Sequence, residues 1–158
     1  MKDIYEVLKA LGIEYVRHDH APVFTCEESA AIGPPRPGDT KNLFLRNKNG
    51  DRCYLVSLGH EKKADLKTLK EKLGESKLSF GSPERLMQKL GLTPGSVSLL
   101  GLCNNAERDV IVILDADLWK NDVIACHPNL NTATLEIART DLEKFIRHCG
   151  NEMRVMEL

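Results

Sequence analysis

The dipeptide Asn49-Gly50 is the feature that most constrains how this chain can fold, because it is a strong signal for a tight β-hairpin. Before it, residues 43–45 form a short apolar run of the kind found in a strand buried on both faces. The turn therefore predicts an antiparallel pair. One strand begins near Lys41, and its partner covers residues 52–58.

Further helix and strand signals lie on both sides of the hairpin. A Thr-x-x-Glu capping box predicts a short helix over residues 25–32, and apolar periodicity with Gly74 as a stop predicts a helix over 64–73. The apolar segment 96–102 is expected to be a strand. Together these signals predict one α/β domain spanning residues 1–158, with mixed α+β character. Its central mixed, largely antiparallel sheet should have about six to seven strands, with helices packed outside.

Composition and cysteine usage limit the class of protein. The chain has 158 residues, of which 42% are hydrophobic and 28% charged, as expected for an ordinary globular domain. It holds no apolar run of about 18 residues, so no membrane span is expected. Its N-terminus lacks the apolar core of a signal peptide. The five cysteines are odd in number and widely spaced, so a disulfide framework is not expected. We therefore expect a cytoplasmic protein with reduced thiols.

The formal net charge of −1 argues against extensive binding to nucleic-acid backbone. Domains that contact many phosphates are usually plainly basic. No DNA partner is therefore expected. Contact with RNA would involve few groups, at an end or a single stem.

Two polar residues stand where the first hairpin strand begins. Lys41 and Asn42 follow the segment 33–40, which holds three prolines and two glycines and should form a stiff loop. A cation and an amide at the end of a rigid element are well placed to hold an anionic or carbonyl-bearing ligand. On position alone, Lys41 could equally be an ordinary solvated lysine.

Known catalytic and metal-binding motifs are missing from the sequence. His18 and His20 would share a face only in a strand, and Pro22 soon interrupts it, so a metal site there is disfavoured. No GxSxG elbow, P-loop or GxGxxG motif occurs, and no cysteine or serine stands in a recognisable nucleophile context. No metal and no cofactor are therefore expected.

Two further segments have both a functional and a structural interpretation. His127 lies at the end of an expected strand and is followed by Pro128 and polar residues, which suits either ligand contact or a capped turn. Lysines that include Lys67 cluster on and around the helix 64–73. Acidic residues interleave with them, so this helix is either simply solvated or a modest phosphate-contacting face.

Five segments of the chain form a recognisable set: 22–25, 40–45, 78–82, 91–97 and 127–134. In this order they resemble the YbaK-like family of free-standing aminoacyl-tRNA deacylases, which is related to the editing domain of bacterial prolyl-tRNA synthetases. The resemblance covers nearly the whole chain, and the His-Pro-x-x-Asn-Thr-Ala-Thr segment is similar to the branch that hydrolyses alanyl-tRNA(Pro). The segment 98–101 departs from the pattern, since relatives often carry Thr-Pro-Phe-Ala there.

The resemblance implies roles for individual residues. Lys41 would hold the terminal phosphate or ester and stabilise developing negative charge, while Asn42 would orient the ester or ribose. His127 would line the aminoacyl pocket. The remaining implied contacts are Thr25 and Ser29 in another wall, Gly95 and Gly101 where backbone approaches the ligand, Asn131 in the histidine segment, and Arg46 and Lys67 on the acceptor stem.

The function implied is trans editing of alanyl-tRNA(Pro), without a metal or an enzyme nucleophile. The implied partner is the acceptor end of mischarged tRNA(Pro), and the sequence leaves open whether prolyl-tRNA synthetase is also bound. Two alternatives remain at this point. One is a deacylase for another small mischarged residue, such as cysteinyl-tRNA(Pro). The other is a non-catalytic module that binds an amino acid or a tRNA end.

Overall fold

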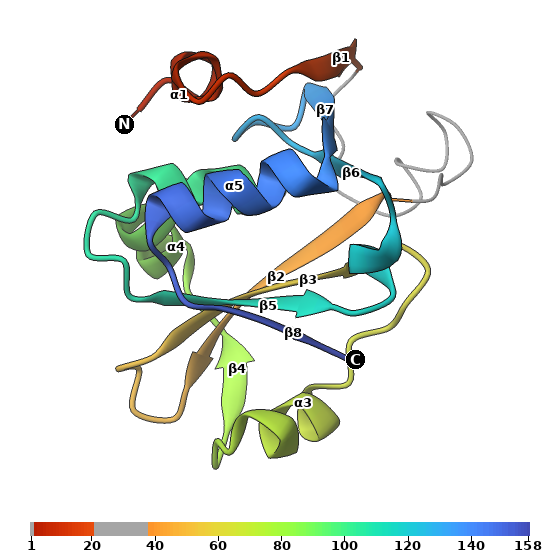
Figure 1. Ribbon diagram of the computed structural model, residues 1–158. Coiled ribbons are helices and arrows are strands. Elements are labelled where there is room, and N and C mark those ends of the chain that lie inside the picture. Colours follow the sequence, from red (N-terminus) through yellow and green to blue (C-terminus); the bar gives the residue numbers. More distant parts are fainter. Residues whose placement is uncertain (1, 21–37) are drawn as a thin grey trace.

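The hairpin predicted at Asn49-Gly50 forms the centre of the larger of two sheets (Figure 1). The structure is a computed structural model that describes residues 2–20 and 38–158. Strands β2 (Thr40–Asn47) and β3 (Cys53–Gly59) pair antiparallel, with Leu43 opposite Val56. The hairpin prediction is thus confirmed.

Three more strands complete this five-stranded sheet, whose order is β4-β2-β3-β5-β8. Strand β4 pairs antiparallel with β2, whereas β3–β5 and β5–β8 are parallel pairs. A separate three-stranded antiparallel sheet has the order β1-β7-β6. The bounds are β1 (Tyr15–Asp19), β4 (Leu78–Phe80), β5 (Val110–Asp115), β6 (Val123–Cys126), β7 (Ala133–Ala138) and β8 (Met153–Met156).

The mixed α/β fold class is confirmed, and most strand pairs are antiparallel as expected. The arrangement differs from the prediction in one respect. The described strands form sheets of five and three strands in place of one central sheet. Alternation of polar and apolar residues predicts which face of a strand is buried, but it carries no information about which strands pair.

Helices cover both faces of the larger sheet. In Figure 1, α5 lies across one face and α3 lies against the other. Phe44 belongs to the larger apolar cluster on the α5 side, and its neighbour Leu45 belongs to the smaller cluster on the α3 side. The helices are α1 (Ile4–Ala10), α3 (Leu66–Leu73), α4 (Pro83–Leu90) and α5 (Arg139–Cys149), with short 3-10 helices η1 (Leu99–Asn104) and η2 (Leu118–Lys120).

Local signals explain where the predicted helices begin and end. The Asp65 carboxylate accepts hydrogen bonds from the main-chain N–H groups of Lys67 and Thr68 at 3.1 and 3.3 Å, and left-handed Gly74 closes α3. The Ser82 hydroxyl caps α4 in the same way, by accepting from Arg85 N at 3.1 Å. None of the helices in the described ranges is long and apolar enough to cross a membrane.

The segment 96–102 is not a strand, and this prediction was wrong. Residues Leu99–Asn104 form η1, which begins where the Ser98 hydroxyl accepts from Leu100 N at 3.1 Å. A short, fully apolar run fits a buried helical turn as well as a buried strand, so its periodicity could not separate the two. In the structure, η1 is a buried turn that packs against α4 and α5.

Candidate functional site

The two sheets meet where β2 begins. Asp39 forms a parallel bridge with Ala125 of β6, and Ala125 N donates to Gly38 O at 2.9 Å. Gly38 has a φ of +90°, and a Cβ atom there would lie 2.1 Å from Val123 O. Only glycine permits this close crossing. We call the place where residues 38–42 pass β6 the β2–β6 junction (Figure 1).

The junction brings together segments that are far apart in the sequence. The bridge between Asp39 and Ala125 brings the start of β2 beside β6. Lys41 and Asn42 follow the bridge along β2, and His127 directly follows Cys126, the last residue of β6. Lys41 and His127 each stand two residues beyond the bridge in the chain.

The imidazole of His127 is held in one orientation. Its Nδ1 lies 3.2 Å from the carbonyl oxygen of Ala133, which can only accept, so Nδ1 carries the proton of the neutral ring. Nε2 then offers a lone pair. Burial lowers the pKa of His127 from its ordinary 6.5, the hydrogen bond to Ala133 raises it, and neighbouring His20 lowers it further. The ring is therefore neutral at pH 7, with Nε2 as an acceptor.

His20 also belongs to this site, and the sequence reasoning missed it. Its ring lies edge-on to that of His127 with centroids 6.3 Å apart, and its Nε2 is 2.9 Å from the Thr134 hydroxyl. The neighbouring His18 pairs with Glu136 at 3.1 Å. In the sequence, the alternation of two histidines indicates only a possible metal pattern. Strand β7 pairs with β1 so that Thr134 lies opposite His18, and the Thr134 side chain reaches the ring of His20 two residues further on.

Asn42 takes part in a chain of polar contacts across the junction. Its Oδ1 accepts from the hydroxyl of Ser57 on β3, and its Nδ2 lies 3.4 Å from the hydroxyl of Thr40. The Thr40 hydroxyl in turn donates to the carbonyl of Ala125 at 2.7 Å. The chain links β3, β2 and β6, and thus both sheets.

The Lys41 side chain lies on the opposite face of β2 from the Asn42 side chain. Side chains alternate along a strand, so Lys41 lies on the face of Leu43 while Asn42 lies on the face of Thr40. In residues 2–20 and 38–158, the Lys41 ammonium makes no hydrogen bond or ion pair. The β4 pairing covers only residues 45–47, so the adjacent edge of β2 is open in the described chain. A long lysine side chain at an open edge can reach either face.

The other predicted contact residues have different surroundings. Gly95 is an exposed turn residue with a φ of +91°, whereas buried Gly101 lies in η1, where an added Cβ would be 2.6 Å from Leu92 Cδ1. Asn131 is half-buried in the turn between β6 and β7. Thr25 and Ser29 lie outside the described residues.

The two residues expected on the acceptor stem lie away from the junction. Arg46 is five residues beyond Lys41, about 16 Å along an extended strand. Its guanidinium contacts the hairpin by donating to Lys48 O at 3.4 Å. Lys67 is exposed on α3, which lies at the opposite end of the molecule from β6 (Figure 1).

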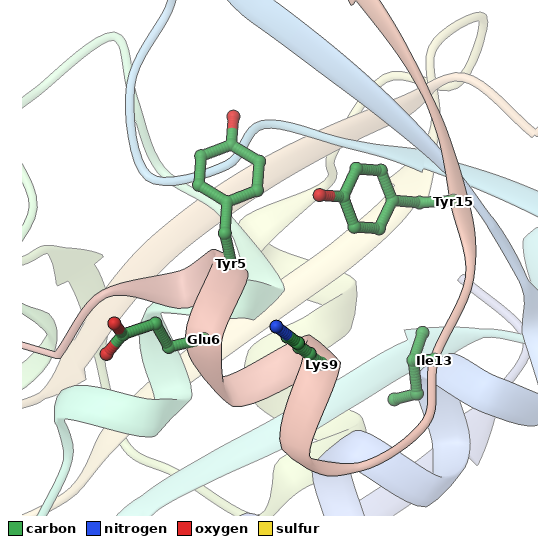
Figure 2. A pocket seen from close by; sticks show the side chains of 5 residues that line it. All are labelled: Tyr5, Glu6, Lys9, Ile13 and Tyr15. Carbon is green, nitrogen blue, oxygen red and sulfur yellow. The ribbon is translucent and has the colours of Figure 1, made fainter.

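A separate hollow of about 370 Å³ lies between α1 and β1 (Figure 2). The Arg17 guanidinium stands 5.2 Å from the centroid of the Tyr5 ring, and the Tyr5 and Tyr15 rings are 5.8 Å apart. Of the predicted site residues that the structure describes, none lines this hollow. The lining residues are Tyr5, Glu6, Lys9, Ile13 and Tyr15.

The junction also contains a thiol. Cys126 precedes His127, and complete burial raises the pKa of its thiol to about 12. A thiol is nucleophilic only as the thiolate, so Cys126 is an inert core residue at neutral pH.

Comparison with known proteins assigns the chain to a family. Residues 20–145 match the profile of the aminoacyl-tRNA editing domain. Prolyl-tRNA editing protein ProX of Acetoanaerobium sticklandii is 41% identical over 152 residues, which cover 96% of this chain and 93% of that protein. Prolyl-tRNA synthetase associated domain-containing protein 1 of Danio rerio is 36% identical over 148 residues, with coverage of 92% and 80%.

Solved structures share the fold. The hypothetical protein APE2540 superposes with a TM-score of 0.74 at 19% identity, over 96% of this chain and 97% of that one. A protein described as a candidate trans-editing enzyme for prolyl tRNA synthetase gives a TM-score of 0.71 at 20% identity, over 100% and 98%. At such identities the likeness shows the fold alone. The profile match and the ProX alignment show the family: this chain belongs to the aminoacyl-tRNA editing domain family.

Proposed function

We propose that this protein is a trans-editing deacylase that hydrolyses mischarged alanyl-tRNA(Pro) to alanine and tRNA(Pro). The observation that carries the proposal is the β2–β6 junction. Near it lie Lys41, which has no hydrogen-bond or ion-pair partner among residues 2–20 and 38–158, the oriented amide of Asn42 and the neutral ring of His127, in a chain of the editing family. ProX, at 41% identity, is named a prolyl-tRNA editing protein, which supports tRNA(Pro) as the substrate.

The reaction needs a second site for a physical reason. A pocket built for proline cannot strongly reject the smaller alanine, because each missing methylene changes binding by only about 1–3 kcal/mol. The error must then be removed after transfer. An editing site has to admit a methyl side chain, exclude the pyrrolidine ring and stabilise charge on the ester.

Each junction residue has a role that fits its environment. The Lys41 ammonium, which has no partner among the residues described, would hold the terminal phosphate or ester and stabilise developing negative charge. Asn42 orients the ester or the ribose. The Nε2 lone pair of His127 accepts a hydrogen bond from the substrate, such as one from a ribose hydroxyl.

The chemistry is proposed to use neither an enzyme nucleophile nor a cofactor. The aminoacyl ester is already activated, and the terminal ribose supplies a neighbouring hydroxyl. The thiol of Cys126, which precedes His127, is protonated, since burial raises its pKa to about 12. Hydrolysis by water in an oriented, charge-stabilising site is therefore the mechanism that suits these residues.

Contacts to the rest of the tRNA are proposed to be few. The net charge of −1 fits recognition of an RNA end more than of a long duplex. Arg46 and Lys67 lie away from the junction and would contact only a more distant part of the acceptor stem. Prolyl-tRNA synthetase is proposed as a partner that delivers the mischarged product.

The test is a parallel deacylation assay with alanyl-, cysteinyl- and seryl-tRNA(Pro), using purified protein. Preferential release of alanine is expected. Preferential release of cysteine would mean that cysteinyl-tRNA(Pro), and not alanyl-tRNA(Pro), is the substrate. Tight tRNA binding without release of any amino acid would contradict a deacylase and establish a binding module.

A further inference from the structure

We propose that Thr40 and Ser57 are positioning residues, which fix the Asn42 carboxamide so that it presents an N–H group to the substrate. The inference rests on the proposed function, because it assigns Asn42 its chemical part in the reaction. It identifies the group that Asn42 would bind as a hydrogen-bond acceptor, namely the ester carbonyl oxygen or the oxyanion formed from it.

The direction of the polar chain follows from one backbone group. The carbonyl of Ala125 can only accept, so the Thr40 hydroxyl, 2.7 Å away, must donate its proton there. The Thr40 oxygen can then take part in a second hydrogen bond only as the acceptor. Its neighbour at 3.4 Å must therefore be the Nδ2 group of Asn42, which sets the orientation of the amide.

The other half of the amide is fixed from β3. With Nδ2 toward Thr40, the Oδ1 atom faces Ser57, whose hydroxyl donates to it. Ser57 is completely buried, so no water can take the place of Asn42 as the partner of that hydroxyl. A flipped amide would leave the Ser57 proton facing an N–H group, and a buried donor without an acceptor is costly.

One donor of Asn42 is left over. A carboxamide has two N–H bonds, and the contacts of Asn42 in the described chain use one of them, toward Thr40. Asn42 is half-buried at the open edge of β2, so the second N–H can meet a ligand. Because Oδ1 is occupied, Asn42 acts on the substrate as a donor. Donors held in place before charge develops act mainly on the transition state.

The test combines single substitutions with a double-mutant cycle. Ser57→Ala and Thr40→Val should each lower kcat for alanyl-tRNA(Pro) about tenfold with KM nearly unchanged, and Thr40→Ser should restore it. In an Asn42→Ala background the same two substitutions should change kcat by less than about twofold, because the amide they orient is absent. Equal losses in both backgrounds would overturn the proposal.

A second readout does not depend on catalysis. In ¹⁵N-labelled protein, the two side-chain N–H signals of Asn42 should lie away from the positions of a solvent-exposed asparagine and exchange slowly with water, and Ser57→Ala should move them toward those positions and speed their exchange. This result, in a protein that releases no amino acid from any tRNA, would leave the positioning role standing and defeat only the proposed function. Unchanged Asn42 signals in Ser57→Ala would overturn the positioning role itself.

Discussion

The two ends of β2 carry similar residues and differ in what those residues bind. Lys41-Asn42 opens the strand and Arg46-Asn47 closes it. At the closing end, Asn47 donates from Nδ2 to Asp51 at 2.6 Å and accepts at Oδ1 from Arg52 N at 3.2 Å. This end is a hairpin turn whose polar groups have structural partners.

The opening end leaves hydrogen-bonding groups available. In the described chain, Lys41 has no charged partner, Asn42 retains one N–H, and the Nε2 lone pair of His127 stands nearby. Buried polar groups are normally satisfied within the protein, so groups held in place without partners indicate ligand binding. Residue type alone therefore does not distinguish a binding site from a turn, whereas the state of the hydrogen bonds does.

The largest difference between the two ends should come from their cations. Lys41→Ala should lower kcat/KM for alanyl-tRNA(Pro) about 1,000-fold, because a charge aimed at the reacting ester is lost. Its circular dichroism and thermal unfolding should match the wild type, since the Lys41 ammonium has no hydrogen-bond or ion-pair partner within the described part of the chain. Arg46→Ala is the matched control, and it should keep kcat within about threefold of the wild type. A fully active Lys41→Ala protein would remove Lys41 from the site.

The two asparagines should separate activity from stability. Asn47→Ala should lower the free energy of unfolding by about 1–2 kcal/mol, because a buried side chain loses its two hydrogen bonds to Asp51 and Arg52, while kcat stays near the wild-type value. Asn42→Ala should lower kcat about 100-fold in protein that remains folded. Urea unfolding and steady-state deacylation measure the two effects. Equal kcat losses for both variants would mean that the ends of β2 are not functionally distinct.

The pH profile should report His127. Its pKa is lowered in the folded protein, so Nε2 remains an acceptor as the pH falls through 6.5, the ordinary value. Activity should persist below that point and decline only at the lower, folded-state pKa. A decline in kcat/KM with an apparent pKa at or above the ordinary value would remove the neutral ring from the mechanism.

The lowered pKa of His127 also predicts a smaller effect, on the stability of the fold. Between the lowered folded-state pKa and 6.5, the unfolded chain binds more protons at this histidine than the folded chain does. The free energy of unfolding should therefore fall as the pH drops through that window. His127→Gln, which cannot be protonated, should show a weaker fall in a urea titration at several pH values.

The smallest effect is expected from the distant cations. Arg46→Ala combined with Lys67→Ala should raise KM about fivefold and reduce the salt dependence of tRNA binding, if each contacts a phosphate. The kcat value should hold, because neither residue lies at the junction. An unchanged KM at low and high salt would place the acceptor stem elsewhere on the protein.

Local signals allowed much of the fold to be predicted. Asn49-Gly50 indicated the hairpin, and apolar periodicity with Gly74 at its end indicated the helix that the structure shows as α3. The fully apolar run 96–102 lacked such a signal, and its 3-10 conformation depends on Ser98 and on packing against α4 and α5. Division into two sheets was not predictable either, since it depends on which strands pair.

The site was predictable only in pieces. Lys41 could be placed at the start of a strand, and His127 at the end of another. Their proximity depends on the bridge between Asp39 and Ala125, which are far apart in the sequence. In the sequence, nothing distinguishes Ser57 from an ordinary strand residue. Its contact with Asn42 follows only from the register of the hairpin. Sequence signals are local, whereas the contacts that build this site are not.

The central claim is that the substrate end binds at the β2–β6 junction, and chemical-shift mapping tests it most directly. A non-hydrolysable 3′-alanylamide analogue of the terminal adenosine should be titrated into ¹⁵N-labelled protein. The account predicts shifts at Lys41, Asn42 and His127, with Arg46 and Asn47 unmoved. Shifts confined to the Tyr5 and Tyr15 hollow, or to the far end of β2, would contradict it.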